Sequence, residues 1–217
     1  MANDLILTGN KALANVQRSI SVLNKLLPNS LDKLAWWNSL SYDWKNIFLS
    51  ELKASEIEFN QKPDFYLEKL FNITLFDTTK LKICKNQIQD ISPLGNLTQL
   101  TSLDLRYNQI QDISTLGNLT KLTRLRLDVN KIQDISALGN LTQLTELALH
   151  ANQIRNISAL RHLTQLISLD LGRNQIQDIS PLATLENLET LHLGLTPISQ
   201  PNIDWLQSKL PNCWIIY

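Results

Sequence analysis

The sequence predicts an α/β fold: a right-handed solenoid with a concave parallel β-sheet, short 3-10 or helical turns on its convex side, and an α-helical cap at the N-terminus. Two observations lead to this prediction. A 22-residue phrase, L-x-L-x-x-N-x-I-x-D-I-S-x-L-x-x-L-T-x-L-T-x, recurs in register between residues 81 and 193. An asparagine keeps one place in successive copies, at Asn86, Asn108, Asn130, Asn152 and Asn174. A period of this length indicates stacked repeats, because one copy is too short to bury a core by itself.

Pairs of aliphatic residues mark the expected strands. Because side chains alternate along a strand, both members of each pair face the core and the residues between them face outward. The pairs are Leu81/Ile83, Leu103/Leu105, Leu125/Leu127, Leu147/Leu149, Leu169/Leu171 and Leu191/Leu193. Stacking these strands predicts a parallel sheet with a continuous aliphatic core behind it.

Each asparagine follows its strand, where the chain must turn away from the sheet. Its amide carries donors and an acceptor, so we expect an inward-facing ladder that satisfies backbone groups of its own and the adjacent turn. The D-I-S-x-L segment is expected to open a short helical turn. Ser92-Pro93 and Ser180-Pro181 fit an N-cap serine followed by proline at the first helical position.

The chain is expected to divide into three parts. Residues 1–70 lack the 22-residue period and form a helical capping region, with Trp36, Trp37 and Trp44 in the cap and a helix break near Ser39 and Ser41. Residues 71–200 form about six repeats. Residues 201–217 form a closing helix and strand, in which Cys213 takes the place of a strand leucine.

Bulk composition narrows the function classes. The chain has 217 residues, is 43% hydrophobic, and carries 20 basic and 20 acidic side chains. This balance argues against a dedicated binder of nucleic acid or anionic membrane. The N-terminus does not resemble a signal peptide, and no apolar run approaches the roughly 18 residues of a membrane span. We therefore expect a cytoplasmic monomer.

The two cysteines are not expected to pair. Six strand spacings separate Cys84 from Cys213, or roughly 29 Å at about 4.8 Å per strand. A disulfide needs Cα atoms within about 7 Å of each other, so both thiols are predicted to be reduced.

The outward positions of the strands are the candidate binding site. In-register stacking forms columns down the concave face, in which Arg106, Asp128 and His150 are neighbours, as are Asp170 and His192. Trp214 is expected in the column between the paired leucines. The candidate partner-binding residues are Lys82, Asp104, Arg106, Tyr107, Arg124, Arg126, Asp128, His150, Asp170, Arg173, His192 and Trp214.

These columns do not predict catalysis. No serine or cysteine nucleophile falls beside either imidazole, no glycine-rich phosphate loop is present, and two isolated histidines fall short of a metal set. The sequence therefore predicts no catalytic residue, metal or cofactor.

Charge is uneven along the face. The first three strands carry six cations against Asp104 and Asp128, namely Lys80, Lys82, Lys85, Arg106, Arg124 and Arg126. Arginine holds carboxylates in two-point contacts, so we expect a protein partner with an acidic segment at this end.

The repeat phrase resembles the short 22-residue class of leucine-rich repeats, shared by bacterial internalin-like proteins and a regulatory subunit of a eukaryotic protein phosphatase. The end of the chain, from Leu210 to Tyr217, resembles a closing strand of that family. The resemblance implies a non-enzymatic protein-interaction module that binds its partner on the concave face. Two alternatives stay open: an internalin-type adhesion or host-targeting fragment, and a structural spacer.

Overall fold

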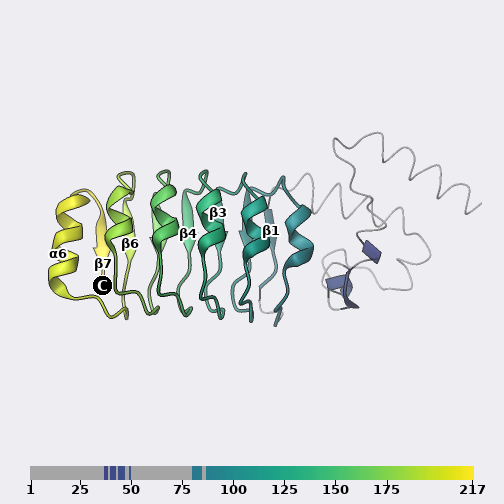
Figure 1. Ribbon diagram of the computed structural model, residues 1–217. Helices are drawn as coiled ribbons and strands as arrows, with labels where there is room; N and C mark the ends of the chain where they lie inside the picture. The colour runs from purple at the N-terminus through teal and green to yellow at the C-terminus, as the bar shows by residue number, and fades with distance from the viewer. Residues whose placement is uncertain (1–36, 39, 43, 47–48, 50–79, 85–86) are drawn as a thin grey trace, which may run out of the picture. The chain divides into compact units, whose positions relative to one another are not determined.

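The computed structural model describes residues 37–38, 40–42, 44–46, 49, 80–84 and 87–217 (Figure 1). The chain forms two compact units, Met1–Thr74 and Leu75–Tyr217. Most of the expected N-terminal helical region, including Trp36 and Ser39, lies outside the described residues, as do Lys85 and Asn86.

The described part of the first unit is helical and contains buried tryptophans. Trp37 and Trp44 are each exposed by 5% or less. The chain bends at Leu40, and Ser41 Oγ accepts a hydrogen bond from the backbone N–H of Trp44 at the start of the next helical stretch. A serine whose side chain accepts the backbone N–H of the third residue after it is an N-cap. A helical stretch therefore begins after Ser41, which explains the predicted helix break. Both tryptophans belong to a packed interior.

The second unit is a single parallel sheet whose strand order follows the chain. Its described strands are β1 (Lys80–Lys82), β2 (Ser102–Asp104), β3 (Arg124–Arg126), β4 (Glu146–Ala148), β5 (Ser168–Asp170), β6 (Thr190–His192) and β7 (Trp214–Ile216). Leu103 pairs with Leu125, Leu125 with Leu147, and so on with the 22-residue period. The predicted repeat sheet is confirmed.

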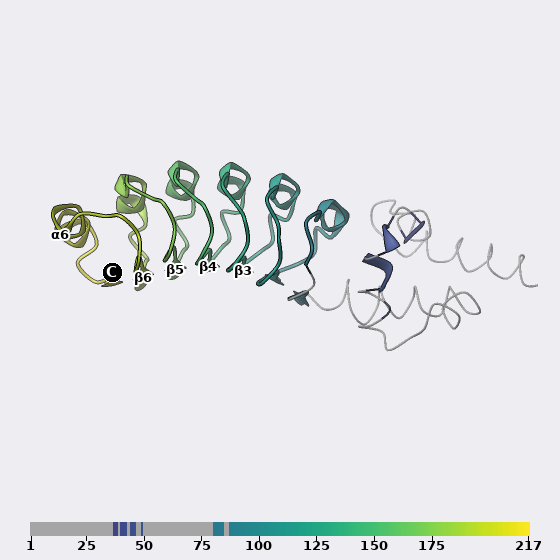
Figure 2. The ribbon, with the colours of Figure 1, turned by 90° about the horizontal axis from the view of Figure 1, so that it is seen from below.

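Short helical turns form a second layer on the other side of the core (Figure 2). They are the 3-10 helices η2 (Ser92–Asn96), η3 (Ser114–Asn118), η4 (Ser136–Asn140), η5 (Ser158–His162) and η6 (Ser180–Thr184), followed by the α-helix α6 (Gln200–Lys209). Figure 2 shows these turns fanned more widely than the strands, so the sheet is the concave side of this unit. Within the described ranges, no helix is long and apolar enough to cross a membrane.

The predicted serine caps are wrong. Each serine is the first residue of its 3-10 helix, and the isoleucine before it has the N-cap position without a side-chain bond. The capping oxygen comes from the residue two positions earlier. Asp90, Asp112, Asp134 and Asp178 Oδ1 each accept the serine N–H at 2.8 Å, and Asn156 Oδ1 does so at 2.9 Å. An Asx-turn therefore takes the role given to serine.

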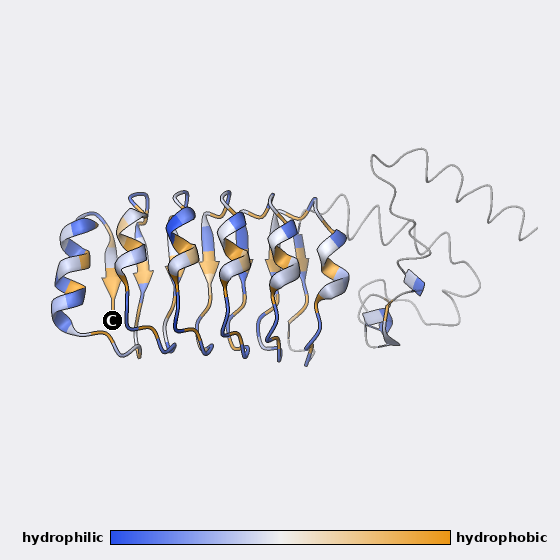
Figure 3. Ribbon diagram, viewed as in Figure 1, coloured by the Kyte–Doolittle hydropathy of each residue, from blue (hydrophilic) through white to orange (hydrophobic). Residues whose placement is uncertain are grey.

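The core is aliphatic and continuous from turn to turn. Leu125, Leu127, Leu138 and Leu141 are fully buried, as are their equivalents in neighbouring repeats. Figure 3 shows apolar colour on the strands and on part of each helical turn. Each such leucine contributes about 1.5–3 kcal/mol of burial free energy, which exceeds any single polar contact on the surface.

The asparagine ladder is confirmed at the positions that the structure describes. Asn108, Asn130, Asn152 and Asn174 are 5–8% exposed. In each, Oδ1 accepts the N–H of an isoleucine in the preceding turn, and Nδ2 donates to backbone carbonyls of two successive repeats. In the tight turn after each strand, backbone N–H and C=O groups no longer pair within the sheet. The asparagine side chains supply the hydrogen bonds that these buried groups need.

The last strand has a different register from the predicted one. Leu191 pairs with Ile215 and His192 with Ile216, so the step from β6 to β7 is two residues longer than the repeat. The reason is α6, whose 10 residues replace the five of a 3-10 turn. Cys213 is buried but precedes the strand, and Trp214 belongs to the first outward column, beside Thr190.

Candidate functional site on the sheet face

The outward side chains of the strands form the sheet face, which strand register divides into columns. The first column holds Lys80, Ser102, Arg124, Glu146, Ser168, Thr190 and Trp214. The second holds Lys82, Asp104, Arg126, Ala148, Asp170, His192 and Ile216. Just beyond the strands follow Cys84, Arg106, Asp128, His150, Gly172 and Gly194. Ten of the twelve expected binding residues thus lie in these columns, and the other two, Tyr107 and Arg173, directly follow Arg106 and Gly172 in the chain.

Arg106 is engaged by a residue of its own turn. Its Nε and Nη2 donate to Asp104 Oδ1 at 2.9 Å and Oδ2 at 2.8 Å, and Cys84 Sγ donates to Asp104 Oδ1 at 3.0 Å. Burial works against ionisation of Asp104, but the hydrogen bonds from Arg106 and Cys84 outweigh it and lower the pKa of Asp104 to about 2. Burial and the bond to Asp104 raise the pKa of the Cys84 thiol, which makes it a poor nucleophile.

Arg124 is also paired, with Glu146 on the next strand. Both side chains are more than a third exposed, so this pair adds little stability. Lys80, Lys82 and Arg126 make no ion pair within the described residues. The basic end therefore holds three cations without an ion pair to any described residue, the uncommitted cations, beside two neutralised arginines.

Two carboxylates flank His150 in the middle of the face. Asp128 Oδ1 accepts the backbone N–H of His150 at 3.1 Å, and His150 Nδ1 lies 3.7 Å from Asp170 Oδ1. Asp170 also accepts the N–H of Gly172 at 2.9 Å. A Cβ on Gly172 would lie 2.8 Å from His150 Nδ1, so the imidazole packs where only glycine leaves room. Burial, together with the nearby charge of Asp170, raises the pKa of Asp128.

The predicted neighbours are thus only partly in contact. Asp128 and His150 are joined through the backbone, whereas Arg106 bonds Asp104 instead of Asp128. His192 lies beside Asp170 in the register, but the carboxylate is directed toward His150 and Gly172.

One column has an unusual backbone. Tyr107, Val129, Ala151, Arg173 and Leu195 all have φ between 53° and 61°. A left-handed conformation costs an L-residue about 1–2 kcal/mol, and most for a β-branched residue such as Val129. In the first four of these turns the following ladder asparagine compensates, as Asn130 Nδ2 does by bonding the carbonyls of Leu127 and Asp128, the two residues before Val129. This backbone leaves Tyr107, Val129 and Leu195 exposed by 48%, 38% and 81%.

Asp128 is expected to cost stability at neutral pH. A raised pKa means that the fold favours the protonated acid. The stability that protonated Asp128 gives to the fold is therefore present at low pH and is lost as pH rises through that pKa. Asp128→Asn keeps an acceptor for His150 and removes the charge. We expect it to raise the free energy of unfolding at neutral pH by about 0.5–1.5 kcal/mol. Urea denaturation at neutral and acidic pH measures this gain.

The gain from Asp128→Asn should shrink in acid, where the wild-type carboxyl is also uncharged. Glu146→Gln, at an exposed carboxylate, is the matched control and should leave the midpoint nearly unchanged. Equal midpoints for wild type and Asp128→Asn at neutral pH would mean that ionised Asp128 is not disfavoured by the fold.

Neither a metal site nor a nucleophilic centre is visible in the described residues. No group of three or more His, Cys, Asp or Glu side chains there could hold a metal ion. The Asp–His contacts have no serine beside them, and Cys84 bonds a carboxylate. The described side chains of the face offer charge, hydrogen-bonding groups and exposed aromatic area for recognition.

Some surface residues fall outside the candidate binding set. Val129 and Leu195, which are 38% and 81% exposed, extend the sheet face beyond that set. The side chains that line hollows along the edge where the strands end, among them Gln133, Asp134 and Trp205, were also not selected. A signal was present, because glutamine and aspartate recur there with the 22-residue period.

Comparison with known proteins agrees with this architecture. A family model described as Leucine Rich repeats (2 copies) matches residues 79–119, 120–162 and 164–212. No curated protein matches the chain.

Three solved structures are similar. An internalin from Listeria monocytogenes has 30% identity and a TM-score of 0.66, over 81% of this chain and 55% of its own length. Internalin C2 from the same species has 30% identity and a TM-score of 0.56, over 80% of this chain and 81% of its own length. TLR13 in complex with ssRNA13 has 28% identity and a TM-score of 0.56, over 65% of this chain and 22% of its own length. The chain thus spans about half of the first internalin.

Proposed function

The chain belongs to the leucine-rich repeat family, and from that premise we propose that it is a non-enzymatic interaction module whose sheet face binds a partner protein through an acidic segment. Members of a repeat family share a scaffold and differ in the side chains on it, so the choice of partner must rest on the outward columns.

The observation that carries the proposal is the set of uncommitted cations at the β1–β3 end. Lys82 and Arg126 lie in the same column, two strand spacings or roughly 10 Å apart. Asp104 stands between them, but both of its oxygens are held by Arg106. An acidic partner segment would supply carboxylates to Lys82 and Arg126, and exposed Tyr107 beside the column offers aromatic contact area.

The same face disfavours nucleic acid. Asp104, Asp128, Glu146 and Asp170 lie on it, and a phosphate backbone would be repelled by each carboxylate that is not already paired. We therefore propose a protein partner and a monomeric binder without a cofactor. A reducing, cytoplasmic location is part of the proposal, supported by Cys84 and Cys213, which are not joined in a disulfide.

The second candidate is an adhesion or host-targeting role of internalin type. It is favoured by the 30% identity to two internalins over about four fifths of this chain. In that case the partner would be a protein outside the cell of origin. A structural spacer, the third possibility, would have no preferred partner at all.

The test compares two charge reversals after a pull-down has supplied the partner. Lys82→Glu with Arg126→Glu should slow association about 10- to 100-fold and remove most of its salt dependence, because the attraction that guides encounter is lost. Stopped-flow or biosensor association rates at several salt concentrations give the answer, with the circular dichroism spectrum checked for an intact fold.

The matched control is Lys121→Glu with Lys131→Glu. These lysines lie outside the strands and donate to glutamine side chains of the preceding turn. Their reversal alters net charge equally but should change the association rate only slightly. If this control is the damaged one, the partner uses an edge of the solenoid and the sheet-face proposal is wrong.

A further inference from the structure

A second surface lies along the edge where the strands end, at the bottom of Figure 1, and we call it the lateral edge. Three hollows lie on it. One of about 350 Å³ is lined mainly by Gln111, Asp112, Lys131, Gln133, Asp134 and Ser136. The next, about 470 Å³, shares Gln133 and Asp134 with it and continues through Gln153, Arg155 and Gln175. The third, about 300 Å³, combines Asp178, Ser180 and Asn202 with Trp205.

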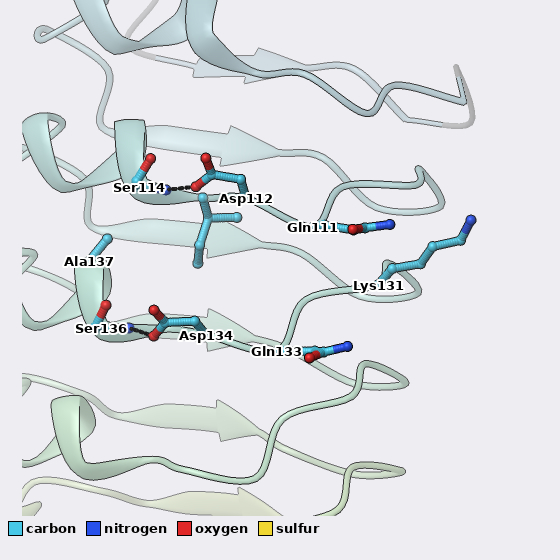
Figure 4. Close-up of a pocket in the computed structure, with 9 residues that line it drawn as sticks. Gln111, Asp112, Ser114, Lys131, Gln133, Asp134, Ser136 and Ala137 are labelled. Atoms are coloured by element: carbon cyan, nitrogen blue, oxygen red, sulfur yellow. Dashed lines mark hydrogen bonds between the residues drawn. The ribbon is translucent and has the colours of Figure 1, made fainter.

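The carboxylates of this edge are fixed in direction. Asp112 and Asp134 Oδ1 accept the N–H groups of Ser114 and Ser136, as Figure 4 shows, so each carboxylate is held against the start of a 3-10 helix. Hydrogen bonds from the Ser114 N–H and hydroxyl lower the pKa of Asp112, which keeps this group ionised and accepting. Rigid acceptors of this kind lose little entropy when a ligand hydroxyl binds.

The amides form a ladder across the repeats. Gln133 Nε2 donates to Gln153 Oε1 at 3.0 Å, and Arg155 Nε donates to Gln175 Oε1 at 2.9 Å. Figure 4 shows Gln111, Gln133 and Lys131 projecting to the same side, away from the 3-10 layer. Each primary amide has more donors and acceptors than these bonds use, so a row of hydrogen-bonding groups recurs about every 4.8 Å.

Charge along the edge nearly cancels. Lys131 lies between Asp112 and Asp134, and Arg155 follows Asp134 in the next hollow. A polyanion would meet the carboxylates and a polycation would meet Lys131 and Arg155, so the matching ligand is uncharged. Trp205 is 39% exposed and lines the third hollow beside an aspartate, a serine and an asparagine.

We propose that the lateral edge binds a neutral, extended oligosaccharide, whose hydroxyls bond the amides and carboxylates while one sugar ring stacks on Trp205. Vicinal hydroxyls offer donor and acceptor together, as planar amide and carboxylate groups require. Trp205 gives the apolar face of a sugar ring a flat surface. A peptide is a poorer match, because its side chains need apolar hollows and these are lined mostly by polar groups.

The inference is independent of the partner on the sheet face. It is tested with the full chain by affinity electrophoresis in gels that contain hydroxyethylcellulose, laminarin, galactomannan or soluble starch. We expect at least one of these neutral glycans to retard the wild type. Trp205→Ala should weaken that retardation about tenfold, and Gln133→Ala with Gln153→Ala should weaken it similarly.

The matched control is Gln99→Ala with Gln143→Ala, two exposed glutamines in the loops that precede the strands, at the opposite edge. This variant should bind like the wild type. Thermal melts check each fold, and if Trp205→Ala is unstable the double glutamine variant decides the matter.

Three results would overturn the proposal. They are no retardation by any of the four glycans, retardation that the lateral-edge variants leave unchanged, and equal loss in the control variant. Binding of a glutamine-rich synthetic peptide through the same residues, in place of the glycans, would make the edge a peptide site instead.

Discussion

Replacing Asn130 by alanine is expected to lower the free energy of unfolding by about 3 kcal/mol or more, although its side chain is buried and is not part of the sheet face. Its Oδ1 accepts the Ile110 N–H at 3.1 Å, and its Nδ2 donates to the carbonyls of Leu105 and Leu127 at 3.1 and 2.9 Å. All three backbone groups are buried, and water cannot replace the lost amide. Each unsatisfied group costs about 1–3 kcal/mol, so the sum exceeds the loss of one ordinary hydrogen bond.

Asn118→Ala is the matched control, because Asn118 is an exposed asparagine at the end of a 3-10 helix. It should shift the urea midpoint by very little. Asn130→Asp should be as damaging as Asn130→Ala, since a carboxylate keeps the bond from Ile110 but cannot donate to the two carbonyls. Similar midpoints for Asn118→Ala and Asn130→Ala would mean that the ladder bonds are not a major source of stability.

The ladder also explains why the fold was predictable. A leucine pair and one asparagine per period have only one arrangement that buries every copy, because any slip between strands would put an asparagine against aliphatic core. The register of β2 to β6 follows directly from the 22-residue spacing. Only β7 departs from it, since the length of α6 is not encoded in the repeat.

The candidate site was predictable as a set of positions but not as a set of contacts. Periodicity places Asp104, Arg106 and Asp128 on one surface, yet it is silent on side-chain rotamers. Arg106 reaches back along its own turn to Asp104, a contact that strand columns do not suggest. The same gap hides the pairing of Arg124 with Glu146, whereas Arg126 has no ion pair to a described residue.

The left-handed column shows another limit. Glycine or asparagine usually signals such a backbone, but here tyrosine, valine, alanine, arginine and leucine adopt it. For the first four residues the cause lies one residue later, in the ladder asparagine whose bonds require the turn. Leu195 is followed by Thr196, whose hydroxyl donates to the Leu193 carbonyl in place of the amide. Local propensity is overridden by a tertiary network, and the result is a row of exposed side chains at the rim of the sheet face.

Gly95→Ala is expected to lower the free energy of unfolding by about 1–3 kcal/mol, through crowding on the convex layer. A Cβ at Gly95 would lie 2.2 Å from Thr115 Oγ1 of the next turn, too close for any real contact. The same position in later repeats faces alanine. The added Cβ meets its nearest atom at 3.4 Å at Gly117 and at 3.6 Å at Gly139.

The space around these three glycines predicts how alanine substitutions at them rank in their effect on stability, which composition alone does not. None of these glycines has positive φ, so alanine is allowed by the backbone and should stabilise by about 0.4–1 kcal/mol where there is room. Gly139→Ala is therefore expected to raise the unfolding midpoint, Gly117→Ala to change it little, and Gly95→Ala to lower it.

The decisive experiment is a double-mutant cycle with Thr115→Ala, which reproduces the alanine of the later turns. In that background Gly95→Ala should become neutral or stabilising, a coupling of about 1–3 kcal/mol between residues that face each other across two repeats. If Gly95→Ala remains as damaging after Thr115→Ala, the cost does not come from stacking of adjacent turns, and the close spacing of the convex layer is not what requires glycine.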